Sequence, residues 1–306
     1  MESIATKVAV LMAVKNGATY LPEQLDSILH QKQCLVSLIV SDDFSADSST
    51  EYLQKYSADK SNITLLPNTL SFGSAAKNFY RLILDAEIDD FDYIAFADQD
   101  DIWCPDKLIR HIQLAREHNA DGVSSNVIAF WPDGREKLLD KAQPQRELDF
   151  LFESAGPGCT FLMTPWLINK LREHLLDENS PAKEATLHDW LTYAVCRANG
   201  RKWIIDSVPS VKYRQHQTNV VGANVGITAK WTRLQKLKQR WYRDEVIKIT
   251  KVCYKISAHS ELGQLIKLLE NKNIISQLQL LCYIPKVRRK LSDRFLLAGA
   301  ILTSLF

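Results

Sequence analysis

The chain has 306 residues, of which 46% are hydrophobic and 24% charged, and its formal net charge is +2 at pH 7. This composition is typical of a globular protein with a sizeable core, and it excludes a disordered, collagen-like or disulfide-stapled chain. The length favours one large α/β domain, or a domain with an appendage, because single hydrophobic cores stop growing near roughly 250–300 residues.

Alternating apolar and amphipathic segments predict the elements of the N-terminal half. The continuous apolar run at 8–14 is typical of a parallel strand covered on both faces, and a helix at 21–29 follows it. Further strands are expected at 35–40, 63–66 and 93–97, and further helices at 48–56 and 75–86. This order predicts an α/β fold with a doubly wound, mostly parallel sheet, whose ligand site lies at the carboxyl ends of the strands.

Acidic residues gather just after two of these strands. Asp42 and Asp43 follow the second strand, and Asp98, Asp100 and Asp101 follow the strand at 93–97. Three carboxylates within four residues repel one another unless a cation neutralises them, and Mg²⁺ or Mn²⁺ shared with a substrate diphosphate suits such ligands. The alternative is an acidic loop that caps the following helix.

Two common nucleotide-binding motifs are missing from the sequence. The first strand is not followed by the glycine fingerprint of dinucleotide-binding folds, and no G-x-x-x-x-G-K-[ST] stretch occurs. Hydride transfer and P-loop chemistry are therefore disfavoured.

The cysteines and the hydropathy pattern bear on location. The six cysteines form no Cys-x-x-Cys pair, so we expect buried, reduced thiols. The N-terminus has no secretory-signal pattern, and no apolar run reaches the roughly 18 residues of a membrane span. These features predict a cytoplasmic protein.

The order and spacing of several motifs resemble glycosyltransferase family two, the inverting sugar transferases of the GT-A fold. The resemblance covers roughly residues 7–222 and is carried by Ser41-Asp42-Asp43-Phe44-Ser45, Asp98-Gln99-Asp100-Asp101-Ile102-Trp103, Gly156-Pro157-Gly158, His188-Asp189-Trp190 and Tyr213-Arg214-Gln215-His216. The second and last of these look most like the bacterial rhamnosyltransferase-like branch, which acts in O-antigen and capsule polysaccharide biosynthesis. The resemblance implies a metal-dependent hexosyltransferase with a Rossmann-like GT-A domain.

The resemblance also implies roles for individual residues. Asp189 matches the catalytic base, which takes the proton of the acceptor hydroxyl as that oxygen attacks the anomeric carbon. Asp98 and Asp100 match the D-x-D motif, with Asp100 the direct ligand of Mg²⁺ or Mn²⁺, and His216 matches a late histidine that completes the metal site. The other implied contacts are Asn16, Asp43, Asp98, Asn78 and Arg214 on the nucleotide-sugar donor, and Trp103, Gly158 and Trp190 on the acceptor.

Structural interpretations compete with several of these roles. An aspartate at the start of a helix is commonly a cap, a single histidine is commonly structural, and the two tryptophans could belong to the core. Asn68, Gly73 and Asn78 fit a nucleotide-lining segment and, equally, a turn followed by a capped helix. His188 is expected to be structural.

The C-terminal part is strongly basic. Residues 230–306 carry 16 Lys and Arg against 5 Asp and Glu, a net charge of +11, whereas residues 1–229 have a net charge of −9. Trp231, Leu234, Leu237 and Trp241 recur at helical spacing, which predicts an amphipathic basic helix. Such a helix suits an anionic membrane surface, and the alternative is a helix packed on the catalytic domain. Nucleic acid is disfavoured because no RNA or DNA module accompanies the basic residues.

Together these features predict the domains and the function. We expect a catalytic domain at 1–225, with a nucleotide-sugar half at about 1–110 and an acceptor half at about 111–225, and a basic helical tail at 226–306. The expected reaction is inverting transfer of L-rhamnose from dTDP-L-rhamnose to a lipid-linked glycan, by a peripheral enzyme on the inner face of the cell membrane. The alternatives are a UDP-hexose or UDP-N-acetylhexosamine transferase of the same fold and, from another class, a non-catalytic glycan-binding or assembly protein.

Overall fold

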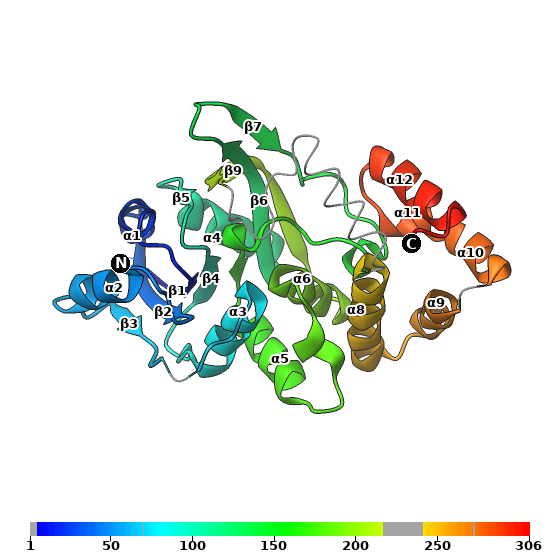
Figure 1. Ribbon diagram of the computed structural model, residues 1–306, viewed down its shortest axis with the longest axis horizontal. Helices are drawn as coiled ribbons and strands as arrows, with labels where there is room; N and C mark the ends of the chain where they lie inside the picture. The colour runs from blue at the N-terminus through cyan, green and yellow to red at the C-terminus, as the bar shows by residue number, and fades with distance from the viewer. Residues whose placement is uncertain (1–4, 69, 217–240, 272) are drawn as a thin grey trace.

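The computed structural model describes residues 5–68, 70–216, 241–271 and 273–306. Its centre is a nine-stranded sheet with the order β3-β2-β1-β4-β8-β6-β9-β5, and β7 pairs with β6 outside this path (Figure 1). The strands are β1 (Thr6–Val14), β2 (Cys34–Asp42), β3 (Ile63–Leu65), β4 (Tyr93–Ala97), β5 (Ile102–Trp103), β6 (Gly122–Phe130), β7 (Glu136–Leu139), β8 (Leu162–Met163) and β9 (Trp203–Arg214).

The predicted parallel half of the sheet is confirmed. Strand β1 pairs in parallel with both β2 and β4, and β2 pairs in parallel with β3. Strand β2 extends two residues further than expected, because Ser41 and Asp42 continue its pairing with β1. The short strand β8 runs antiparallel to β4 and β6 and joins this half to the rest of the sheet.

Helices cover both faces of the sheet, as alternating side chains of β1 require. Val8, Val10 and Met12 pack in one cluster with α1 (Leu21–Leu29), α2 (Ser49–Ser57) and α4 (Lys107–His118). Ala9 and Leu11 pack in a second cluster with α3 (Ala75–Asp85), α5 (Pro165–Leu176) and α6 (His188–Ala198). Three short 3₁₀ helices complete this region, η1 (Asp149–Leu151), η2 (Gly158–Thr160) and η3 (Pro181–Glu184).

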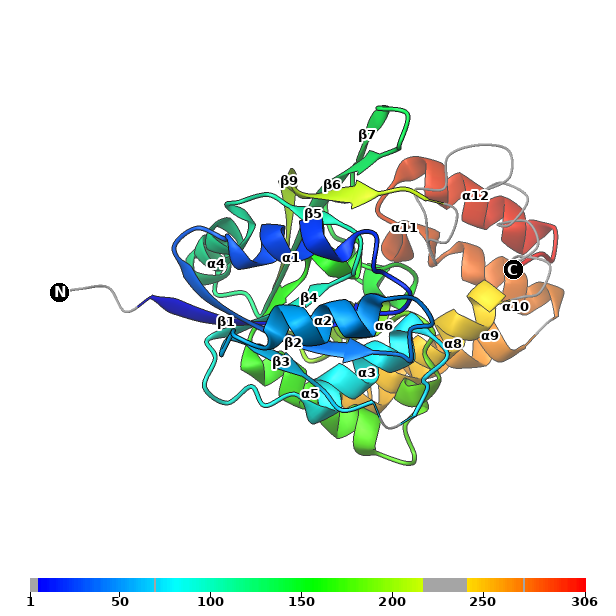
Figure 2. The same ribbon diagram turned by 60° about the vertical axis from the view of Figure 1, so that its left-hand side comes forward.

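The C-terminal part is helical, as predicted, and lies at the opposite end of the molecule from α1 and α2 (Figures 1 and 2). It consists of α8 (Trp241–Ser257), α9 (Ser260–Glu270), α10 (Ile274–Leu281), α11 (Ile284–Val287) and α12 (Leu291–Leu302). No helix in the described ranges is long and apolar enough to cross a membrane.

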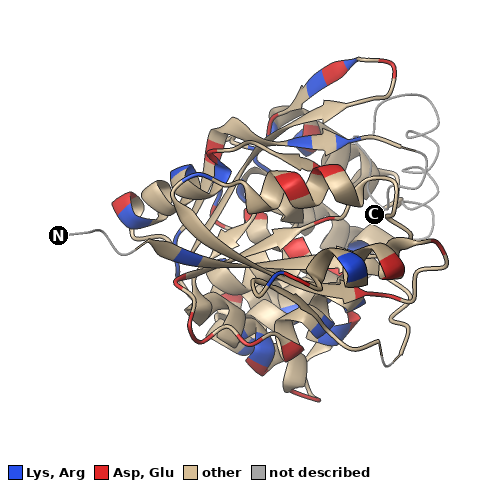
Figure 3. Cartoon of the chain, turned by 90° about the vertical axis from the view of Figure 1, so that its left-hand side faces the viewer, with Lys and Arg blue, Asp and Glu red and all other residues tan. Residues whose placement is uncertain are grey.

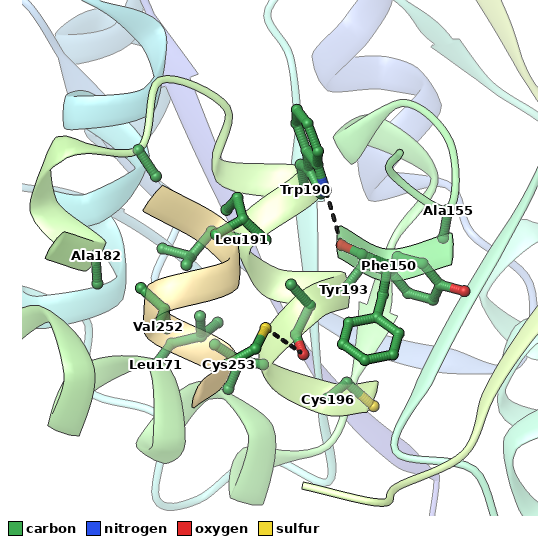
Figure 4. Packing of buried hydrophobic residues seen from close by; sticks show 14 of the residues in the cluster. Phe150, Ala155, Leu171, Ala182, Trp190, Leu191, Tyr193, Cys196, Val252 and Cys253 are labelled. Carbon is green, nitrogen blue, oxygen red and sulfur yellow. Dashed lines mark hydrogen bonds between the residues drawn. The ribbon is translucent and has the colours of Figure 1, made fainter. Parts of the chain in front are cut away.

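Helix α8 packs on the α/β part of the chain. Val246, Ile249, Val252 and Cys253 are fully buried in the same core as α6, and Figure 4 shows Val252 near Leu191. For α8, the alternative of a basic helix that packs on the rest of the protein is therefore confirmed. Trp231, Leu234 and Leu237, together with the proposed boundary at 225/226, lie outside the described residues.

The cysteines are all free, as expected, but only half of them are buried. Cys159, Cys196 and Cys253 are in the core, Cys34 and Cys104 are half-buried, and Cys282 is exposed. The prediction of buried thiols is wrong for the last three, because their positions lie near the ends of elements rather than on core faces.

Candidate active site

The acidic motif lies at the carboxyl end of β4, next to the end of β1. Asp98 is half-buried, Asp100 is buried, and Asp101 has no exposed surface. Burial raises the pKa of the Asp98 carboxyl to about 7, and the nearby carboxylates of Asp100 and Asp189 add to this shift. The structure thus brings the D-x-D carboxylates and the predicted base into one electrostatic environment.

The end of β9 is bound to this motif through two of the predicted residues. His216 Nε2 lies 2.6 Å from Asp100 Oδ2, and the imidazole stacks on the ring of Tyr20 with 5.0 Å between centroids. Arg214 donates from its backbone amide to Asp101 Oδ1 (3.0 Å) and from Nε to the Asp100 carbonyl oxygen (2.8 Å). The guanidinium of Arg214 also pairs with Glu23 in α1. The segment Tyr213–His216 therefore lies against the acidic motif at 98–101.

Two overlapping sets of side chains could hold a metal here. Ligand atoms of Asp98, Asp101 and Cys159 lie within 4.8 Å of one another. Burial raises the pKa of the Cys159 thiol well above its usual range, and a neutral thiol is a poor ligand for a hard cation. Carboxylate oxygens suit Mg²⁺ or Mn²⁺, so Asp98 and Asp100 fit such a cation. His216 contacts Asp100, but within the described residues these three side chains do not form a compact ligand cluster.

The two tryptophans predicted to contact the acceptor are instead part of the core. Trp103 is 2% exposed, and the ammonium of Lys107 lies 3.0 Å from the centre of its ring. Trp190 is 3% exposed, stacks on Tyr242 and donates from Nε1 to the Phe150 carbonyl oxygen at 2.8 Å (Figure 4). A sugar needs an open ring face for stacking, so the structure does not support this role for either residue.

The side chains predicted on the nucleotide side make contacts within the protein. The Asp43 carboxylate accepts hydrogen bonds from Ser71 Oγ (2.9 Å) and from the amides of Phe72 (2.6 Å) and Gly73 (3.0 Å). Asn78 is buried and donates to the Ser41 carbonyl oxygen at 3.0 Å. Both residues therefore fix the loops after β2 and β3.

Asn16 holds the loop after β1 in a similar way. It has a positive φ of 52°, and its Oδ1 accepts from the Ala46 amide at 2.7 Å. Gln99 joins this loop to the acidic motif, because its side chain accepts from the Lys15 amide (2.6 Å) and donates to the Lys15 carbonyl oxygen (2.9 Å). No pattern in the sequence predicts that Gln99 joins the loop after β1 to the acidic motif.

Asp189 lies in the first turn of α6, half-buried. Burial raises the pKa of its carboxyl to about 6, and the hydrogen bond from the Trp190 amide (2.7 Å) and the nearby cation of Lys141 act against this shift. A carboxyl with this pKa is mostly ionised at pH 7 and still accepts a proton readily, as a general base requires. The amide contact is local, and Asp189 does not cap the helix, because the N-cap of α6 is Leu187 and no side-chain cap hydrogen bond is formed there.

Gly158 lies directly against this part of α6. A Cβ atom at Gly158 would lie 2.5 Å from His188 Nε2 and 3.4 Å from Asp189 Cβ, so a larger residue would displace the start of the helix. His188 stacks on Phe79 with 3.8 Å between centroids, and burial lowers the pKa of its imidazole to about 3. His188 is therefore neutral and structural in this environment, and Gly158 acts through close packing.

Three residues near the site had no signal in the sequence. Tyr20 stacks on His216, Lys141 is a cation near Asp189, and the hydroxyl of Ser154 donates to the Gly156 carbonyl oxygen in the loop before Gly158. Each comes from a turn or loop, where no periodicity predicts which side chains converge.

An α/β domain with a D-x-D motif at a strand end and a carboxylate of raised pKa beside it is the arrangement expected of a GT-A glycosyltransferase. The family described as "Glycosyl transferase family 2" matches the chain over residues 9–167. The chain therefore belongs to glycosyl transferase family 2, and it is a glycosyltransferase.

Similar proteins support this assignment. The chain is 39% identical over 297 residues to the dTDP-rhamnosyl transferase RfbG of Shigella flexneri. The aligned region covers 96% of this chain and 100% of that protein. It is also 26% identical over 166 residues to the UDP-Glc:alpha-D-GlcNAc-diphosphoundecaprenol beta-1,3-glucosyltransferase WfgD of Escherichia coli, which covers 53% of this chain and 62% of that protein.

Solved structures support the fold alone, because their sequences are distant. S. aureus TarS residues 1–349 superpose with a TM-score of 0.59 at 15% identity, covering 98% of this chain and 81% of that chain. The mannosyltransferase PcManGT from Pyrobaculum calidifontis, solved with GDP-Man and Mn²⁺, superposes with a TM-score of 0.51 at 16% identity, covering 98% and 80%.

Proposed function

We propose that this chain transfers L-rhamnose from dTDP-L-rhamnose, with inversion, to a lipid-linked glycan in the synthesis of a bacterial surface polysaccharide such as O-antigen. The observation that carries this proposal is the similarity to dTDP-rhamnosyl transferase RfbG, at 39% identity over nearly the whole length of both chains. The D-x-D motif and Asp189 lie within that range. The name of WfgD, a diphosphoundecaprenol glucosyltransferase, supports a lipid-linked acceptor.

Asp189 acts as the base in this proposal. Its carboxylate accepts the proton of the acceptor hydroxyl while that oxygen forms a bond to the anomeric carbon and the bond to the nucleoside diphosphate breaks. A raised pKa of about 6 suits the proton transfer near neutral pH. Gly158 provides close backbone approach beside the base.

The leaving diphosphate needs charge neutralisation. Asp98, Asp100 and His216 would hold a divalent cation, Mg²⁺ or Mn²⁺, which when bound stabilises the negative charge that develops on the leaving group. Arg214 lies against Asp100 and contributes a second positive charge. Asn16, Asp43 and Asn78 are proposed to shape the nucleotide pocket, chiefly through the loops that they hold.

A lipid-linked acceptor would place the enzyme at the inner face of the membrane. Within the described residues, the basic side chains of the tail mostly form internal contacts. They include Lys248 with Glu245, Lys255 with Asp177 and Lys286 with Glu261. The outer side of α12 instead exposes Leu291, Phe295, Leu296 and Leu302. We propose that 1–225 forms the catalytic domain and that the tail at 226–306 contacts the membrane through this apolar face, helped by basic residues.

The charges on one side of the N-terminal half are mixed. Figure 3 shows acidic and basic residues interspersed over this side of the molecule. This side therefore does not carry the continuous basic stripe typical of a nucleic-acid-binding surface.

A donor screen tests the proposal. Purified full-length chain is incubated with dTDP-, UDP- and GDP-sugars, a lipid-linked acceptor and Mg²⁺ or Mn²⁺, and the released nucleoside diphosphate is measured, with Asp189→Asn as the matched inactive control. Release from dTDP-L-rhamnose that requires the acceptor and stops with EDTA is expected. Preference for a UDP-sugar would support the UDP-hexose or UDP-N-acetylhexosamine alternative, and glycan binding without turnover would indicate a non-catalytic protein.

A further inference from the structure

An arginine from the C-terminal part reaches into the catalytic domain beside the active site. Arg289 lies between α11 and α12, and its side chain has no exposed surface. Its backbone amide donates to Glu153 Oε1 at 2.7 Å, and its guanidinium donates to the Ser154 carbonyl oxygen at 2.5 Å. The same guanidinium lies 3.5 Å from Glu153 Oε2. Arg289 therefore binds Glu153 and Ser154 with both its backbone amide and its guanidinium group.

A buried carboxylate holds this arginine in place. Asp149 in η1 lies 3.6 Å from Arg289 Nη1 and 3.2 Å from Arg197 Nη1, and it accepts from the Tyr193 hydroxyl at 3.0 Å. Burial raises the pKa of Asp149, and the two guanidinium groups counteract this shift. Arg197 and Tyr193 belong to α6, the helix that begins beside Asp189, so the network connects the tail to the helix of the base.

The same segment also packs against the base. The hydroxyl of Ser154 donates to the Gly156 carbonyl oxygen at 3.0 Å and so braces the segment. Gly158, two residues after Gly156, packs against His188 and Asp189. One side of segment 153–158 thus touches Arg289, and its other side touches the base.

We propose that Arg289 is a positioning residue, which fixes segment 153–158, braced by the Ser154 hydroxyl, so that Gly158 orients Asp189 toward the acceptor. The inference rests on the proposed function of Asp189 as the base. It makes the C-terminal helices part of the active-site architecture, although the family match ends at residue 167.

The chemistry of the contact distinguishes arginine from lysine. A planar guanidinium can donate to the Ser154 carbonyl oxygen and face the Asp149 and Glu153 carboxylates at the same time, whereas an ammonium is a single point of charge. Arg289→Lys therefore keeps the positive charge in the network and loses the planar group that contacts Ser154, Asp149 and Glu153 at the same time. This variant should fold, because Asp149 retains a cation beside it.

The test uses the full-length chain, the variants Arg289→Lys, Arg289→Gln and Ser154→Ala, the double variant Arg289→Lys/Ser154→Ala, and the control Arg172→Gln. Arg172 is a half-buried arginine that also donates to carbonyl oxygens, those of Ile83 and Ala86 at the end of α3. For each variant we would measure kcat, the KM for acceptor, nucleotide affinity by calorimetry, the pH profile of kcat and the melting temperature.

If the inference holds, Arg289→Lys and Ser154→Ala each lower kcat by roughly tenfold and move the acid limb of the pH profile upward, while nucleotide affinity is unchanged. Their effects are less than additive in the double variant, because both act through one segment. Arg172→Gln lowers only the melting temperature. The inference is overturned if Arg289→Lys, like the control, changes the melting temperature and leaves kcat and the pH profile as in the parent.

The same assay separates this inference from the proposed function. An inactive parent chain, or an Asp189→Asn variant with normal turnover, would overturn the proposed function itself. Loss of turnover in Asp189→Asn together with unaltered Arg289→Lys kinetics would overturn only the role of Arg289.

Discussion

In the proposed mechanism the carboxyl of Asp189 exchanges a proton with the acceptor, whereas Asp98 serves the donor diphosphate. Asp189 shares an electrostatic environment with Asp98, and its own hydrogen bond comes from the Trp190 amide. The two carboxyls therefore have different proposed roles. This division of roles predicts different consequences when each is changed.

Asp189→Asn should lower kcat by roughly 10²–10⁴-fold, because an amide cannot accept the proton of the acceptor hydroxyl. Nucleotide affinity should change little, since the base faces the acceptor. The measurement is steady-state kinetics alongside calorimetric titration with the nucleoside diphosphate. Near-normal turnover, or loss of nucleotide binding, would contradict the assignment of Asp189 as base.

The pH dependence of turnover follows from the same residue. Its pKa is raised to about 6, so the base is ionised above that pH and protonated below it. We expect kcat to fall about tenfold per pH unit below pH 6 and to be level between pH 7 and 8. Mn²⁺ must be saturating, because the pKa of Asp98 is about 7 and protons compete with the cation there. Constant kcat down to pH 5 would show that another group is the base.

Adjacent carboxylates of the acidic motif should respond in different ways. Asp100 is paired with His216, whereas Asp101 is fully buried and accepts from the Arg214 amide. Asp100→Asn should weaken activation by Mn²⁺ with little change in stability. Asp101→Ala should lower the free energy of unfolding by about 1–3 kcal/mol, because it leaves a buried donor unsatisfied. Urea unfolding and Mn²⁺ titration of activity compare the two, and equal stability of both variants would contradict this distinction.

Several of these residues could be predicted from the sequence, and others could not. Asp98, Asp100, Asp189 and His216 stand in motifs whose spacing is informative. The burial of Trp103 and Trp190 could not be predicted, because an apolar ring suits a core and a sugar equally well. Ser154 and Lys141 act through contacts between segments that are distant in the chain, and no local pattern encodes these contacts.

At the level of elements, the strands and helices up to residue 97 were predictable, because the strands are apolar runs and the helices are amphipathic segments. Strands β5, β6 and β7 were not predicted. The contacts of the tail were harder to predict. Its charge suggested a basic face toward an anionic membrane. Arg288 instead pairs with Glu153, and Arg289 pairs with Asp149, each more than 130 residues earlier. A basic run thus serves internal ion pairs, which composition alone does not reveal.

This packing predicts the effect of removing the tail. A chain that ends at Thr228 loses α8, whose Val246, Ile249 and Val252 are fully buried against the catalytic domain. Each buried side chain contributes roughly 1.5–3 kcal/mol, and together they approach the total stability of an ordinary domain. We expect the shortened chain to aggregate or to unfold without cooperativity.

A milder variant keeps this prediction measurable. Ile249→Ala should lower the free energy of unfolding by about 2–5 kcal/mol in urea denaturation of the full-length chain. Cooperative unfolding of the shortened chain, within a few degrees of the parent melting temperature, would show instead that the tail is an independent unit.

At the scale of the whole molecule, α12 lies at the opposite end from α1 and α2 (Figure 1). On α12, Phe295 is 71% exposed and Leu296 69% exposed. Lys290 and Arg294 stand near the start of the same helix. An apolar helix side flanked by basic residues is typical of a helix that lies in a membrane interface.

The final prediction concerns this side of α12. The double variant Phe295→Ser/Leu296→Ser should bind anionic vesicles at least about tenfold more weakly than the parent, because inserting the two side chains together contributes at least about 1.4 kcal/mol. Leu35→Ser/Leu176→Ser is the matched control, since both leucines are exposed on the catalytic domain. Co-sedimentation at low and high salt separates the contributions, because salt screens the basic residues and leaves apolar insertion intact. If the α12 variant sediments like the control while the parent forms dimers in light scattering that the variant does not, the apolar side is a contact between two copies of the chain and not a membrane site.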